Sequence, residues 1–120
     1  NGTPLKMLIG NSESRKDYWI VRNLKSDDVV IFSFEAPWYA KWKMNRSLLK
    51  QLKLARRKNC RIIWSAASLT KKDRLRILKY LPEYRKCAIV WEQNLDDMLK
   101  SGYERPSVDE GFDDFTYIVS

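Results

Sequence analysis

The residues with the most recognisable chemical spacing lie in the stretch MLIGNSESRKDYWIV, residues 7–21. A phosphate-binding loop has the pattern G-x-x-x-x-G-K-[ST], in which the backbone amides turn inward on a phosphate and the lysine reaches it. At that spacing Gly10 is followed by Arg15, Lys16 and Asp17, directly after an apolar run and before an apolar face at helical spacing. Either a damaged ATP site or a coincidence would produce this layout.

Two acids at this loop oppose a bound polyphosphate. Glu13 adds a negative charge beside the place where the phosphates would lie. Asp17 stands where Ser or Thr would bind Mg²⁺, and its carboxylate repels the phosphates. Lys16 at a helix N-terminus could still hold an anion, and a solvent-exposed lysine is the alternative. We therefore predict a vestigial phosphate loop of Gly10, Lys16 and Asp17.

A second stretch, APWYAKWKMNR at residues 36–46, interleaves aromatic and cationic residues where a strand is expected to give way to a helix. Ligands of α/β proteins bind outside the carboxyl ends of the strands. Aromatics with cations bind single-stranded nucleic acid by stacking and phosphate pairing, and the same residue types anchor protein interfaces. The alternative is that these aromatics simply cover the sheet. The predicted partner-binding residues are Trp38, Tyr39, Lys41, Trp42, Lys43, Arg46, Lys50 and Arg57.

The charge of the chain is strongly positive and unevenly distributed. The net charge is +8 and the sequence pI about 9.6. No acid occurs between Glu35 and Asp73, a region with eleven cations, whereas acids dominate from Glu92 to Asp114. A solvated helix face explains part of this pattern. The excess of cations favours an anionic partner, either nucleic acid or an acidic protein surface.

Composition and length indicate one globular domain. The 120 residues are 44% hydrophobic and include five Trp and six Tyr, enough for a core. Two cysteines without metal-ligand spacing and the lack of histidine predict buried reduced thiols, with no metal and no cofactor. No apolar run approaches the roughly 18 residues of a membrane helix. We expect a soluble cytoplasmic protein with one domain over residues 7–120, and a vector-derived or flexible segment over residues 1–6.

Five apolar runs of strand length set the expected fold. They are rich in Val, Ile and aromatics and show little polar alternation, as parallel strands covered on both faces do. The runs cover residues 6–10, 28–34, 61–67, 87–92 and 115–120. Helical patterns between them predict an α/β domain built from right-handed crossovers.

The helices are expected over residues 16–24 and 45–59 and from Thr70 onward. The hydroxyl of Thr70 can cap the amide of Asp73, and the ring of Pro82 ends that helix, whose apolar stripe is predicted to be Leu75, Leu78 and Leu81. A short helix is expected before the last strand, with turns at Ser101-Gly102 and Glu110-Gly111.

Four segments together resemble the small phage and bacterial P-loop kinases related to polynucleotide kinase. They are GNSESRKD after the first strand, LKSDDVVIF, RIIWSAASLTKKDRLRILKYLP with its Asp-Arg pair, and YERPSVDEGFDDFTYIV with its closing EGFD motif. They occur in the family's order over nearly all of the chain from Met7. The resemblance implies a three-layer α/β/α, P-loop NTPase-like domain with a mostly parallel sheet of about five strands.

The chain departs from this family where phosphoryl transfer needs particular groups. Glu13 and Arg15 replace the usual loop glycines, and the second strand ends in Phe32 and Phe34, leaving only Glu35 as a candidate base. The third strand end, WSAAS, carries no acid.

The lid is also reduced. The segment between Glu92 and Tyr103 is too short for the family's arginine-bearing lid, and the nearest arginine is Arg105. Transfer depends on positioning and charge stabilisation, so four parts are degraded at once. We predict a phage-encoded pseudokinase that binds an acidic host protein or nucleic acid. The alternatives are a protein whose sole partner is nucleic acid, and a divergent but active nucleotide or polynucleotide kinase.

Overall fold

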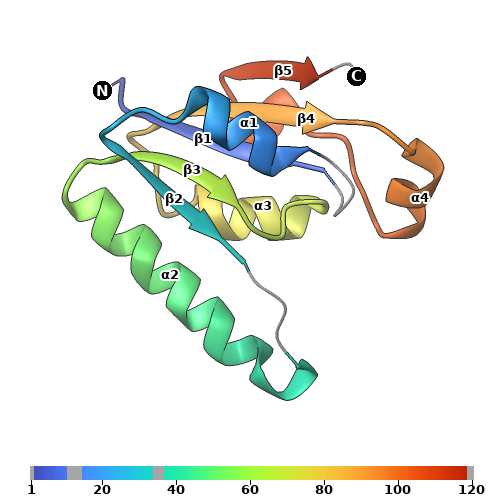
Figure 1. The fold of residues 1–120 in the computed structure, drawn as a ribbon, viewed down its shortest axis with the longest axis horizontal. Coiled ribbons are helices and arrows are strands. Elements are labelled where there is room, and N and C mark those ends of the chain that lie inside the picture. The colour runs from blue at the N-terminus through green and yellow to red at the C-terminus, as the bar shows by residue number, and fades with distance from the viewer. Residues whose placement is uncertain (1, 11–14, 34–36, 119–120) are drawn as a thin grey trace.

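The computed structural model describes residues 2–10, 15–33 and 37–118 (Figure 1). Strands and helices alternate along the chain. In order they are β1 (Pro4–Ile9), α1 (Lys16–Asn23), β2 (Asp28–Phe32), the 3₁₀ turn η1 (Trp38–Ala40), α2 (Lys41–Arg57), β3 (Arg61–Ser65), α3 (Lys71–Leu78), β4 (Arg85–Trp91), α4 (Leu95–Lys100), the 3₁₀ turn η2 (Val108–Glu110) and β5 (Asp114–Ile118).

The five strands form one sheet in the order β2-β3-β1-β4-β5, and every neighbouring pair is parallel. The central strand is β1, in which Leu5 is in register with Ile62 of β3 and Lys86 of β4. Central parallel strands are covered on both faces, which explains their unbroken apolar sequence. The predicted α/β class and parallel five-stranded sheet are confirmed.

Helices cover both faces of the sheet. On one face α2 and α3 contribute Leu48, Leu52 and Ile77 to the larger cluster of buried residues. On the other face α1 packs Trp19 and Ile20 on a smaller cluster that β1, β3 and β4 supply. Figure 1 shows α2 and α3 on the side of the sheet opposite α1. The three-layer α/β/α arrangement is therefore confirmed.

The start of α3 follows the sequence prediction and its end does not. The hydroxyl of Thr70 accepts a hydrogen bond from the amide of Asp73 at 3.1 Å, as predicted. The helix ends at Leu78 rather than at Leu81, because the amide of Leu81 bonds three residues back to the carbonyl of Leu78. Such tight turns are typical of a helix C-terminus, and Pro82 restricts the residue before it.

The buried stripe of α3 is shifted from the predicted one. Leu75, expected in the core, is 46% exposed, whereas Arg74 and Ile77 are buried beside Leu78. The apolar pattern gives no indication that Arg74 is buried, because arginine is rarely buried unless it is paired. Its partner, described below, explains the shift.

The first residues of the chain also differ from expectation. Pro4, Leu5 and Lys6 were expected in a flexible or vector-derived segment, but they form the first half of β1. Leu5 is fully buried in the core. The ordered sheet therefore begins before Met7.

The remaining turns agree with the sequence. Gly102 and Gly111 have positive φ angles of 93° and 109°, a conformation that glycine adopts without steric cost. None of the helices in the described ranges combines the length and the hydropathy that crossing a bilayer requires.

Candidate functional site

The predicted phosphate loop borders a hollow at the carboxyl ends of β1, β2 and β3. The hollow has a volume of about 670 Å³. Gly10, Lys16 and Asp17 all line it, so the structure brings the three predicted residues together. The other lining residues are Phe32, Ser33, Ser65, Ala66, Ala67, Ser68, Leu69, Thr70, Asp73 and Ser101. A ligand of an open parallel sheet binds at this place in the fold.

Lys16 lies in this hollow in a poorly solvated position. Burial lowers the pKa of its ammonium group below the ordinary value of 10.5, and the nearby carboxylate of Asp17 raises it in partial compensation. Burial disfavours the charged form because water no longer solvates it. The retained lysine therefore lies in a partly desolvated position with an acid beside it, a poor arrangement for a polyphosphate.

Among the described residues, the ends of β2 and β3 add apolar and hydroxyl side chains to the hollow. At the end of β2, Phe32 is 60% exposed and borders the hollow together with Ser33. Phe34 and Glu35, the candidate base, lie outside the described residues. The end of β3 supplies Ser65, Ala66, Ala67 and Ser68, and Asp73 adds a carboxylate from α3.

Metal ligands are also sparse in this region. Within the described ranges, no three His, Cys, Asp or Glu side chains lie close enough together to hold a metal ion. The hydroxyl of Ser68 is engaged by the fold, since it donates to the carbonyl of Leu8 at 2.9 Å.

A buried ion pair that sequence reasoning missed holds the loop after β3, which lines this hollow. Arg74 is fully buried and donates to both carboxylate oxygens of Glu110, at 2.6 and 3.2 Å. It also donates to the carbonyls of Ser68 and Leu69, at 2.9 and 3.0 Å. Glu110 in turn accepts from the amide of Ser107 at 2.9 Å. Arg74 thus ties the loop after β3 to the turn before β5.

The two partners belong to motifs that were noted separately in the sequence, the Asp-Arg pair and the EGFD segment. An arginine next to the apolar stripe of α3 was the one signal that could have suggested a buried pair. Its position 36 residues from Glu110 gave no indication of which acid it meets.

Arg105, the arginine nearest to the segment between Glu92 and Tyr103, forms an ion pair with an acid. It donates to both carboxylate oxygens of Glu92, at 2.8 and 2.7 Å, and Tyr103 donates its hydroxyl to the same carboxylate. Arg105 and Tyr103 together lower the pKa of Glu92, with Arg105 as the larger cause. Neither Arg105 nor Glu92 borders the strand-end hollow.

The aromatic residues of the second predicted site do not cover the sheet. Trp38, Tyr39 and Trp42 are 83%, 64% and 54% exposed. The rings of Trp38 and Tyr39 meet edge to face with their centroids 5.8 Å apart. Lys43 and Arg46 lie over the ring of Trp42, at 5.6 and 5.0 Å from its centroid. The alternative that these rings serve as a sheet cover is therefore wrong.

The helix that carries most of this site begins earlier than expected. The sequence placed Lys41, Trp42 and Lys43 in a connection before a helix starting at residue 45, but they form the first turn of α2. Good helix formers in this segment and the half-buried Met44, which packs on the core, account for the extension. The cations are thereby placed on one continuous helix.

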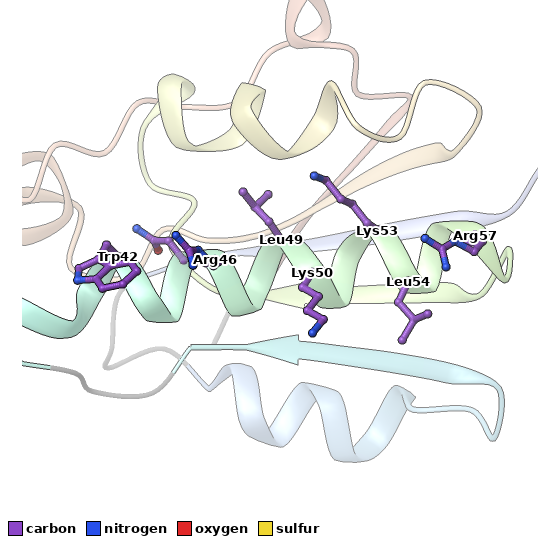
Figure 2. A pocket seen from close by; sticks show the side chains of 8 residues that line it. Trp42, Arg46, Leu49, Lys50, Lys53, Leu54 and Arg57 are labelled. Atoms are coloured by element: carbon purple, nitrogen blue, oxygen red, sulfur yellow. The ribbon is translucent and has the colours of Figure 1, made fainter.

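The outer face of α2 forms a shallow hollow of about 720 Å³ (Figure 2). Four predicted partner-binding residues line it: Trp42, Arg46, Lys50 and Arg57. Lys41 and Lys43 are exposed on the same helix but do not line the hollow, and Trp38 and Tyr39 lie in η1 just before it. The structure adds four residues that were not predicted as site residues: Asn45, Leu49, Lys53 and Leu54.

No protein-family model matches the sequence, and no curated protein matches it.

Proposed function

We propose that this chain is a binding protein of kinase-like fold, without phosphoryl transfer activity, whose partner is an anionic macromolecule. The partner would bind to the surface formed by η1 and the outer face of α2, which we call the α2 face. Its members are Trp38, Tyr39, Trp42, Arg46, Leu49, Lys50, Lys53, Leu54 and Arg57.

One observation carries the proposal. The α2 face presents three largely exposed aromatic rings and four cations along a helix whose 17 residues include no acid. Exposed Trp, Tyr and Arg side chains are the types that dominate binding energy at interfaces. A helix with uncompensated positive charge repels itself and attracts anions. The fully buried residues of α2 are Leu48, Leu52 and Ala55, and of the α2 face only Leu49 is partly buried against the core.

The strand-end hollow supports the absence of transfer activity. It offers Lys16 with a lowered pKa, the acids Asp17 and Asp73, and a β2 end that presents Phe32. Phosphoryl transfer requires a metal ion and cations that stabilise the charge on the moving phosphate. Lys16 shares this hollow with two acids, which oppose an incoming phosphate.

The test is affinity capture from a cell lysate of the source organism, with and without nuclease. The double variant Lys50→Glu/Arg57→Glu reverses two charges of the α2 face, and Lys72→Glu/Lys100→Glu makes the same charge change at exposed positions of α3 and α4. We expect the wild type and the second variant to capture the same material and the first variant to lose most of it. Equal capture by both variants would contradict the proposal.

A divergent active kinase is the second candidate, and it rests on the position of Lys16 at the strand-end hollow. It requires ATP with Mg²⁺ to stabilise the protein, since a ligand that binds the folded state raises the unfolding temperature. We expect no such stabilisation and no transfer of phosphate to a 5′-hydroxyl end. Labelling that disappears in Lys16→Ala would establish the kinase instead.

A further inference from the structure

We infer that the ligand of the α2 face is single-stranded nucleic acid, bound with its backbone along α2 and its bases stacked at the η1 end. This inference rests on the proposed function and names its partner. The site is separate from the strand-end hollow, because the two share no lining residue.

The cations of the α2 face form one straight stripe. Arg46, Lys50, Lys53 and Arg57 follow one another at intervals of four, three and four residues. At 3.6 residues per turn, all four project within an arc of about 60°. Arg56, which forms an ion pair with Glu83 at 2.8 Å, lies beside this stripe rather than in it. A row of like charges in line fits a polymer that carries a charge on every unit.

The apolar residues of the face are arranged differently from those of a helix-binding groove. An amphipathic partner helix needs apolar contacts in a row at intervals of three and four residues. Leu49 and Leu54 are five residues apart and project about 140° from each other around α2. Figure 2 shows Leu49 on the side of α2 where α3 lies and Leu54 on the side where β2 lies. The cations occupy the middle, which disfavours an acidic helix and favours a phosphate backbone.

The aromatic residues distinguish a single strand from a duplex. Trp38 and Tyr39 stand at one end of the stripe, and each keeps most of its ring exposed. Their edge-to-face contact leaves free ring faces on which a base could stack. Unpaired bases stack on aromatic side chains, whereas bases inside a duplex are already stacked on one another. Trp42, one helical turn before Arg46, lies between the η1 aromatics and the cation stripe.

The size of the face sets the expected footprint. From Trp42 to Arg57 the helix rises about 22 Å, which is the length of roughly six stacked nucleotides at 3.4 Å each. Four cations along this length would contact about four phosphates. Binding should therefore weaken with salt at a log–log slope of about −3, at roughly −0.7 per phosphate of a single strand.

The experiment measures binding of the full chain to three fluorescent probes: an oligothymidylate of about twelve nucleotides, a DNA duplex of the same length and polyglutamate. We expect the single strand to bind at least tenfold more tightly than either other probe. Trp38→Ala should weaken its binding roughly five- to a hundredfold, the range for one stacked base, and Trp38→Phe should keep most of the affinity. Lys50→Glu/Arg57→Glu should flatten the salt dependence, and Lys72→Glu/Lys100→Glu should leave it unchanged.

Three outcomes would overturn the inference. Equal binding of the duplex, with no effect of Trp38→Ala, would leave an anion-binding helix without base stacking. Tighter binding of polyglutamate would identify an acidic protein as the partner. Failure of all three probes to bind would exclude simple polyanions as ligands of the α2 face. In each case the proposed function still stands if capture from the lysate depends on Lys50 and Arg57. If capture does not depend on these two residues, the proposed function fails together with the inference.

Discussion

The strand-end hollow and the α2 face differ in what their polar side chains do for the fold. Around the hollow, hydroxyl and guanidinium groups are engaged in structural hydrogen bonds: Ser68 to Leu8, Thr70 to Asp73, and Arg74 to Glu110 and two carbonyls. On the α2 face, the cations and aromatic rings are exposed and line no part of the core.

The difference indicates where selection for binding would be visible. An exposed surface keeps large aromatics and uncompensated charge only at a cost in solubility and self-repulsion. A hollow whose polar groups hold loops together can persist for structural reasons alone. The exposed aromatics and cations of the α2 face are therefore stronger support for a binding function than the position of the strand-end hollow in the fold.

The largest expected effect tests whether the hollow is structural. Arg74→Ala removes one partner of a buried ion pair and leaves the carboxylate of Glu110 unpaired in the interior. Such a change destabilises a protein by about 3 to 5 kcal/mol. Urea denaturation should show a lowered midpoint. Arg105→Ala, which removes a 64% exposed guanidinium and leaves Glu92 its hydrogen bond from Tyr103, should lower the midpoint much less. Similar midpoints for the two variants would contradict a structural role for the Arg74 pair.

The two sides of α2 provide the next test. Leu52 is fully buried against the sheet, and Leu54, two residues later, is 47% exposed on the α2 face. Leu52→Ala should lower the free energy of unfolding by about 2 to 5 kcal/mol, because it leaves a cavity in the core. Leu54→Ala makes the same chemical change and should have little effect. A large loss of stability in Leu54→Ala would show that the outer face serves the fold after all.

The smallest expected effect compares a cation in the hollow with one on the α2 face. The folded-state pKa of Lys16 lies below 10.5, so between the two values the unfolded chain holds more protons and stability rises with pH. Lys16→Met removes the poorly solvated charge. The variant should be the more stable protein at neutral pH, by a margin that shrinks as pH rises through the lowered pKa.

Lys50→Met is the matched control, because Lys50 is exposed on α2. Its urea midpoint at neutral pH should stay close to that of the wild type, because the side chain packs on nothing that is buried. If Lys16→Met also followed the wild type, or were less stable at neutral pH, the charge of Lys16 would be well accommodated and the hollow would remain a candidate anion site.

Most of the fold could be predicted from local patterns. Apolar runs without alternation located all five strands. The helical stripe predicted within residues 45–59, Leu48, Leu49, Leu52 and Ala55, gave the core side of α2, although Leu49 is only partly buried. The cap at Thr70 needed only a hydroxyl three residues before the amide of Asp73. These features depend on residues within a few turns of one another, so their spacing along the chain is sufficient.

The site required the tertiary structure. Sequence grouped Gly10, Lys16 and Asp17, and it selected the aromatic and cationic residues of the α2 face by type. It could not determine that Trp38 stays exposed, because helical spacing says which side chains share a face but not which face remains uncovered.

Composition and periodicity alone therefore determined the α/β class, the parallel sheet and the basic character of the middle of the chain. The tertiary structure decided that Arg74 meets Glu110, 36 residues away, and that four cations of α2 line one exposed face. The physical reason is that burial and pairing are properties of contacts between distant segments. Such contacts exist only when the sheet has brought the segments together.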